Sequence, residues 1–162
     1  GLRRVYGERD LLVAAAIRRQ LWSDLDVSGL AAMVSTLVYE AKPEEMPVRR
    51  GELPPGGLRD ALQSTEELWA RLDVLEREHH LPGSEPLSAQ RAAALWHWAD
   101  GADLIDVIGE DDVAVGDFVR LAKQVVDVLD HIEQVESGPL GTTAREAKAA
   151  VFRGIVALSN LV

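Results

Sequence analysis

The chain has 162 residues, a length that corresponds to one domain with a hydrophobic core of its own. Apolar residues make up 47% of the chain and charged residues 27%, which excludes collagen-like, disordered and disulfide-rich classes of protein. The formal net charge of −10 argues against a generic nucleic-acid binder, because a negative surface repels phosphate groups.

The first part of the chain is predicted to hold two helices followed by one long connection. Apolar residues recur at three- and four-residue steps almost everywhere, which is typical of amphipathic helices, and the period-two alternation of strands is nearly absent after Tyr6. The first helix is expected over residues 8–21, and the second follows the N-cap Asp26 to about Ala41. Residues 42–57 contain four prolines and three glycines, so we predict a surface connection there.

Three helices are predicted in the middle of the chain. The first of them, over residues 58–80, would be about 35 Å long and is expected to span the domain. The next is expected over residues 88–99. Gly101 then breaks the helical pattern, because glycine favours a turn after a helix. A short helix is expected over residues 103–108.

The last part of the chain is predicted to hold two more helices. The sixth helix is expected over residues 113–136, with an apolar stripe facing inward. The seventh is predicted to begin at the capping box formed by Thr143 and Glu146 and to run to the chain terminus. The predicted fold class is therefore all-α, a single bundle of about seven helices over residues 1–162.

Catalytic, cofactor and metal motifs are missing from the sequence. A nucleotide-binding P-loop needs a glycine-rich turn followed by lysine, and none of Lys42, Lys123 and Lys148 has that context. The histidines lack the spacing of a helical zinc pair, and no serine stands in a Gly-x-Ser-x-Gly motif. The absence of cysteine excludes disulfides and zinc fingers and is consistent with a cytoplasmic protein. No apolar run approaches the roughly 20 residues of a membrane span, so we expect no membrane contact.

The sixth predicted helix carries a continuous row of polar side chains opposite its apolar stripe. From periodicity alone, such a row indicates a solvated helix face, and a binding face is the alternative. The apolar stripe consists of Phe118, Leu121, Val125, Leu129 and Ile132, and the polar row of Arg120, Lys123, Gln124, Asp127, His131 and Gln134.

Several blocks of sequence together resemble a known family. They are YGERDLL at 6–12, LWSDL at 21–25, STLVYE at 35–40, and WADGA at 98–102 followed by Asp112, Gly116 and Arg120. In this order they resemble the C-terminal helical domain of superkiller-like DExH-box RNA helicases, called DSHCT, over essentially the whole chain. The amino-acid composition is consistent with a bacterial member of this family. Neither Met33 nor Met46 begins the chain, so we expect a piece of a longer protein.

The resemblance implies a role in an ATP-dependent RNA helicase. Two RecA-like motor domains and a winged-helix domain would lie upstream in the same parent chain, and ATP and Mg would bind in the motor domains. In that family the helical bundle closes the RNA channel, and one long ratchet helix contacts bases of the threaded single strand. The resemblance assigns this role to the sixth helix, with RNA contacts from Arg120, Lys123, Gln124 and Asp127. Some related helicases have a base-stacking aromatic residue at the position of Asp127, so a hydrogen bond is expected there instead.

Two other interpretations follow from the residues. Residues 103–108 and 113–136 have the layout of a helix-turn-helix regulator, although Arg120 and Lys123 are the only cations in 110–136 to contact DNA phosphates. The second alternative is a helical bundle that docks another protein through exposed tryptophans. Because the tryptophans lie mostly on apolar stripes, core packing is favoured for them. They are Trp22, Trp69, Trp96 and Trp98.

Overall fold

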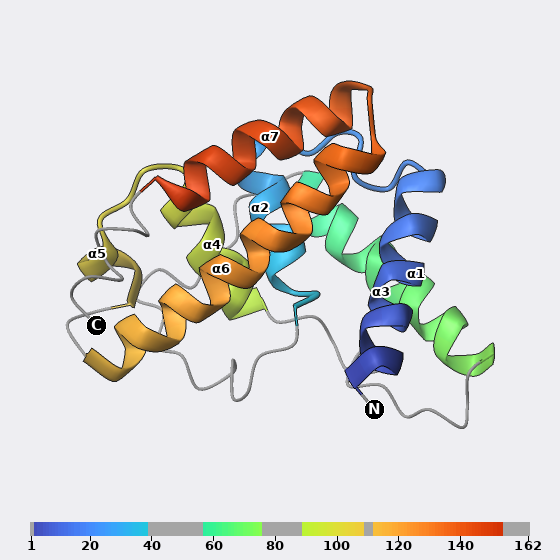
Figure 1. The fold of residues 1–162 in the computed structure, drawn as a ribbon, viewed down its shortest axis with the longest axis horizontal. Coiled ribbons are helices and arrows are strands. Elements are labelled where there is room, and N and C mark those ends of the chain that lie inside the picture. Colours follow the sequence, from blue (N-terminus) through green and yellow to red (C-terminus); the bar gives the residue numbers. More distant parts are fainter. Residues whose placement is uncertain (1, 39–56, 76–88, 109–111, 154–162) are drawn as a thin grey trace.

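The computed structural model describes residues 2–38, 57–75, 89–108 and 112–153, and this part of the chain is helical without any strand (Figure 1). The predicted all-α fold with seven helices is confirmed over these residues. None of the described helices has both the length and the hydropathy required to cross a membrane. The helices are α1 (Leu2–Arg18), α2 (Val27–Ser35), α3 (Gly57–Leu75), α4 (Ala89–Ala99), α5 (Leu104–Ile108), α6 (Asp112–Val135) and α7 (Pro139–Phe152).

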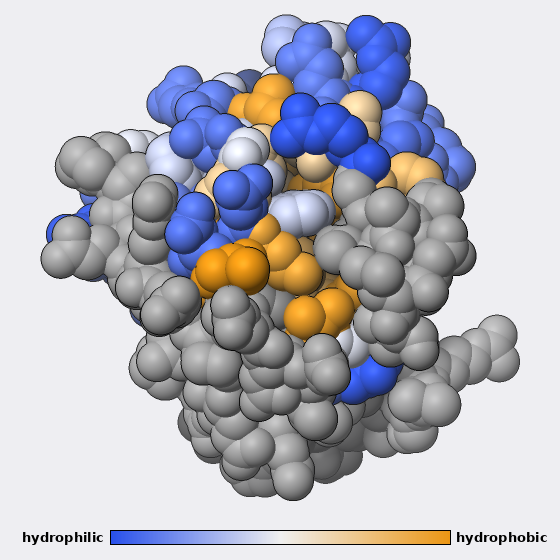
Figure 2. All heavy atoms as spheres, turned by 90° about the vertical axis from the view of Figure 1, so that its left-hand side faces the viewer, coloured by the Kyte–Doolittle hydropathy of each residue, from blue (hydrophilic) through white to orange (hydrophobic). Residues whose placement is uncertain are grey.

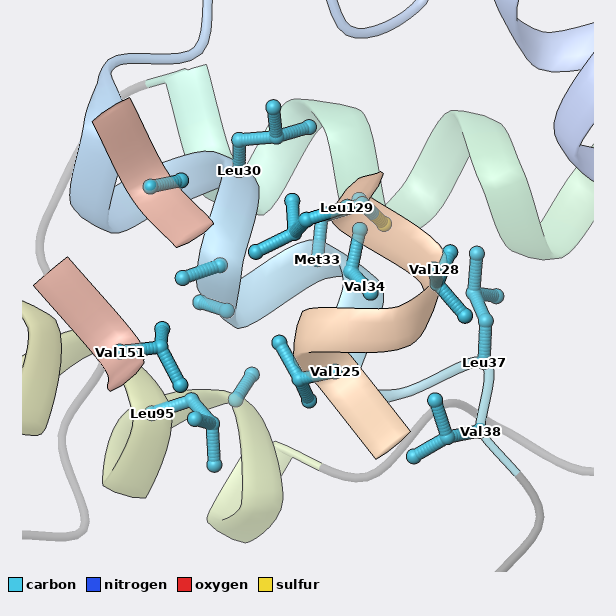
Figure 3. Packing of buried hydrophobic residues seen from close by; sticks show 14 of the residues in the cluster. Leu30, Met33, Val34, Leu37, Val38, Leu95, Val125, Val128, Leu129 and Val151 are labelled. Carbon is cyan, nitrogen blue, oxygen red and sulfur yellow. The ribbon is translucent and has the colours of Figure 1, made fainter. Parts of the chain in front are cut away.

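Helix α2 forms the centre of the fold. It contacts α3, α4, α6 and α7, and all of its residues from Ser28 to Ser35 are buried. The side chain of Asp26 caps its first turn by accepting a 2.7 Å hydrogen bond from the backbone N–H of Gly29, as predicted for an N-cap. Figure 3 shows apolar side chains of α2 packed among those of three other helices: Leu30, Met33 and Val34 among Leu95, Val125, Leu129 and Val151.

The C-terminal end of α2 is also buried, so its last carbonyl groups need hydrogen-bond donors from elsewhere. Arg91 of α4 supplies a donor, because its Nη1 donates to the carbonyl of Ser35, the last residue of α2, at 3.1 Å and to the carbonyl of Val38, just beyond the helix, at 2.8 Å. Arg91 is only 5% exposed. Its positive charge lies at the negative end of the α2 dipole, which compensates for removing the charge from water.

Helices α6 and α7 form an antiparallel hairpin that packs against α2 (Figure 1). The prediction that the seventh helix begins at the capping box of Thr143 and Glu146 is wrong. The helix begins one turn earlier, at Pro139, whose fixed φ suits the first turn of a helix. The Thr143 hydroxyl donates to the carbonyl of Pro139 at 3.1 Å, so it lies inside the helix and does not cap it.

Three other helix ends differ by several residues from the prediction, and one of them is the end of α1, which lies at Arg18 and not at residue 21. Helix α1 begins at Leu2, before the predicted start at residue 8. Gly7 lies inside this helix, and its cost of about 1 kcal/mol relative to alanine is too small to interrupt the helix. Helix α2 ends at Ser35, before Ala41, where the Thr36 hydroxyl and N–H both bond to the carbonyl of Met33. The connection was predicted over 42–57, but Gly57 is the first residue of α3. The rest of that connection, the third helix beyond residue 75 and the seventh beyond 153 lie outside the described residues.

The first part of the chain is anchored to α3 by a buried tryptophan. Trp22 is fully buried, and its Nε1 donates to the hydroxyl of Thr65 on α3 at 3.0 Å. The Thr65 hydroxyl in turn donates to the carbonyl of Ala61 at 2.7 Å. Each polar group in this chain of hydrogen bonds therefore has a partner in the core.

Candidate nucleic-acid interface on helix α6

Helix α6 is a 24-residue rod with one buried side and one exposed side. At 1.5 Å per residue its length is about 36 Å. The predicted apolar stripe is confirmed, since all five of its side chains are fully buried: Phe118, Leu121, Val125, Leu129 and Ile132. The helix is therefore fixed by its inner side, and its outer side is available for contacts.

The four residues expected to contact RNA lie on the outer side of this rod. Arg120, Lys123 and Asp127 are exposed, and Gln124 is half-buried. Residues three, four and seven positions apart share one side of a helix, so the four span about 10 Å along the axis. The structure thus brings them together as the periodicity predicted.

Arg120 has an acidic partner on the same helix. Its Nη2 forms an ion pair with Oδ1 of Asp117, one turn earlier, and the two side chains are 59% and 41% exposed. Asp117 was not among the residues predicted from the sequence, although its spacing of three residues before Arg120 favours such a pair.

We call the exposed side formed by Asp117, Arg120, Lys123, Gln124 and Asp127 the α6 polar face. Two cations lie between two acids, so the formal charges of the α6 polar face cancel. This surface lacks the excess positive charge that draws phosphate from a distance. Its chemistry is suited to short-range contacts, namely stacking by a guanidinium group and hydrogen bonding by amide and carboxylate groups.

A second polar cluster joins the end of α6 to α7. Nζ of Lys148 lies 2.7 Å from Oδ1 of Asp130 and 2.6 Å from Oε2 of Glu133, and Nε2 of Gln134 donates to Oδ2 of Asp130 at 2.9 Å. Hydrogen bonds to Asp130 and then to Glu133 raise the pKa of Lys148 above its usual value. Of the row predicted on α6, His131 and Gln134 are both exposed near this cluster.

The tryptophans of the interaction-module alternative are not gathered on the surface. Trp22 and Trp69 are buried, and Trp96 and Trp98 are half-buried. Nε1 of Trp98 donates to the carbonyl of Val151 at 3.0 Å, which ties α4 to α7. This arrangement supports the prediction that the tryptophans serve mainly in packing.

One face of the molecule combines apolar and polar side chains. Figure 2 shows this face, at which α5 and the first turns of α6 lie, with apolar side chains gathered in one area among polar ones. Two large apolar side chains from neighbouring parts of the fold are exposed, Ile105 of α5 by 49% and Phe152 of α7 by 46%.

The described residues give little support for a metal site or a nucleotide-binding site. Over residues 2–38, 57–75, 89–108 and 112–153, no group of three His, Cys, Asp or Glu side chains is placed to hold a metal ion. Lys123 and Lys148 lie within helices, and Lys148 is held by two carboxylates. Neither lysine follows a loop whose backbone could cradle phosphate.

The geometry is that of a helical domain with one long, firmly anchored helix that presents a polar face. The sequence pattern of the DSHCT (NUC185) domain matches residues 2–159. The chain therefore belongs to the DSHCT domain family. This finding argues against the helix-turn-helix alternative. No solved structure matches the chain.

Two curated relatives show where such a domain occurs. The chain is 36% identical over 167 residues to a "Probable helicase HelY" of Mycobacterium leprae (strain TN). It is 33% identical over 168 residues to a protein of the same name from Mycobacterium tuberculosis (strain CDC 1551 / Oshkosh). Each match covers 97% of this chain but only 18% of the relative. The chain thus spans less than a fifth of the length of these relatives.

Proposed function

We propose that this chain is the helical C-terminal domain of an ATP-dependent RNA helicase. In this proposal a single RNA strand passes through a channel in the parent protein. The domain closes this channel by packing against the RecA-like and winged-helix domains of the same parent chain. The family assignment and the relatives named as probable helicases support it. The α6 polar face is the surface that contacts the strand.

The observation that carries this proposal is the division of α6 into two sides. Five fully buried side chains hold the inner side, so the outer side keeps a fixed position relative to the rest of the bundle. Arg120 would stack on any base, because its guanidinium group is planar and exposed. Lys123 would supply one mobile positive charge, and Gln124 and Asp127 would hydrogen-bond to base edges.

ATP hydrolysis belongs to other parts of the parent chain in this proposal. The residues of this chain do not form a nucleotide-binding site, because the two described lysines lie within helices and no P-loop occurs in the sequence. The net charge of −10 is compatible with a domain that supplies one wall of a channel, provided that other domains contact the phosphates.

The test is the substitution Arg120→Ala in the full-length parent protein. Losing one stacked guanidinium is expected to slow RNA unwinding about five- to hundred-fold, since such contacts are worth about 1–3 kcal/mol per base. ATP hydrolysis without RNA should change little. The substitution should cost the fold only about 0.5 kcal/mol, because Arg120 is exposed.

Arg145→Ala is a matched control, because Arg145 is also an exposed arginine but belongs to α7 and not to the α6 polar face. This control should unwind RNA like the wild type. Wild-type unwinding by the Arg120→Ala protein would refute the assignment of strand contact to α6.

A further inference from the structure

The ion pair between Asp117 and Arg120 distinguishes the two cations of the α6 polar face. Arg120 is paired with the carboxylate of Asp117 one turn away. Lys123 has no ion-pair partner among the described residues. The two cations are therefore in different electrostatic environments, although they lie within one turn of each other.

Pairing with a carboxylate changes what a guanidinium group can bind. The carboxylate occupies donors at the edge of the planar group and neutralises its charge, while the two flat faces remain able to stack. A phosphate that approached Arg120 would have to displace Asp117 and would also be repelled by it. A base has no net charge and meets no such barrier.

We propose that Asp117 is a positioning residue that reserves Arg120 for stacking on bases and keeps the phosphates of the strand away from its guanidinium group. At this point the strand then passes α6 with a base, not a phosphate, against Arg120. This inference rests on the proposed function, and it adds the residue that selects between two modes of contact.

Salt dependence distinguishes the two modes of contact, because each phosphate neutralised by a protein cation releases counterions. The experiment measures binding of the full-length parent protein to a fluorescent oligouridine strand without ATP, over a range of NaCl concentrations. For Asp117→Asn we expect the slope of log affinity against log salt to steepen by about 0.7, the value for one phosphate on a single strand. At low salt this variant should bind about two- to five-fold more tightly.

Three further variants separate this effect from a general change in charge. Asp117→Glu keeps a carboxylate near Arg120 and should keep the wild-type slope. Glu146→Gln removes one charge from an exposed site on α7 and should also keep that slope. In the double variant Asp117→Asn, Arg120→Ala, the additional slope should disappear, because the new phosphate contact requires Arg120.

Several results would overturn the inference. An unchanged slope in Asp117→Asn would show that Asp117 does not keep phosphate from Arg120, and equal steepening in Glu146→Gln would show a non-local charge effect. Because exposed ion pairs contribute little to stability, all variants should remain folded by circular dichroism. If Arg120→Ala alone leaves binding and unwinding unchanged, the proposed function itself fails. If Arg120→Ala impairs them while Asp117→Asn keeps the wild-type slope, only this inference fails.

Discussion

Gly141 lies against the backbone at the end of α6, in the first turn of α7. A Cβ atom placed on Gly141 would lie 2.9 Å from the carbonyl carbon of Glu136 and closer still to its oxygen. No such contact exists at Gly138, where a Cβ atom would meet nothing within 4 Å. The close approach of α7 to α6 therefore depends on the absence of a side chain at Gly141.

The substitution Gly141→Ala combines two opposing effects on stability. Alanine favours the helix over glycine by about 1 kcal/mol. The new methyl group would meet backbone atoms that cannot rotate away, so the α6–α7 turn must move, and we expect a cost of about 3 kcal/mol, the upper part of the range for overpacking. The net loss is about 2 kcal/mol in the free energy of unfolding, or about 4–8 °C in Tm for a chain of this size.

Thermal denaturation of the 162-residue chain followed by circular dichroism measures this difference. Gly138→Ala is the matched control. Because its φ of −93° and ψ of −159° suit alanine, it should cost about 1 kcal/mol or less. A Tm for Gly141→Ala equal to or above that of the wild type would refute the close packing of the two helices at this point.

Three other substitutions test the packing and the ion pairs. Trp98→Ala should lower the free energy of unfolding by about 3 kcal/mol in a urea melt, because the indole contacts two helices, and a loss below about 1 kcal/mol would place Trp98 outside the core. Thr65→Val should cost about 1–3 kcal/mol, because Trp22 Nε1 loses its buried acceptor; a melt like that of the wild type would contradict that hydrogen bond. Hydrogen bonding to Asp130 raises the pKa of Lys148 above its usual value near 10.5, so the stability from this ion is fully present below pH 10.5 and is lost as the pH rises through the raised pKa. As the pH rises above 10.5 the wild type should therefore lose stability more steeply than Lys148→Met, and parallel curves would show that the cluster does not stabilise the fold.

The faces of the helices could be predicted well because they depend on local periodicity. Side chains at positions 118, 121, 125, 129 and 132 share one side of any helix that contains them, whichever element packs against it. The turn after α4 was predictable for a similar reason, since Gly101 has a φ of 103° that favours glycine. The helix ends were predicted less well. The pair Thr143 and Glu146 matches a capping box locally, yet Pro139 begins the helix.

The candidate site, too, could be predicted from the sequence only in part. The outer side of α6 could be predicted from spacing, and so could the group of Arg120, Lys123, Gln124 and Asp127 on it. The pairing of Arg120 with Asp117 was not identified, although Asp117 is the one acid of α6 that lies three or four residues from Arg120. The role of the four residues in RNA contact stays a prediction.

The sequence by itself determined the helical class, the inner and outer sides of α6 and membership of the DSHCT family. Only the tertiary structure decided which charged side chains meet which groups far away in the sequence. Arg91 caps the end of α2 across 53 and 56 residues of sequence, and Lys148 pairs with Asp130 across 18. Local periodicity specifies which side of a helix is apolar, whereas these contacts depend on the relative rotation of two helices. That rotation is set by the packing of the whole core around α2.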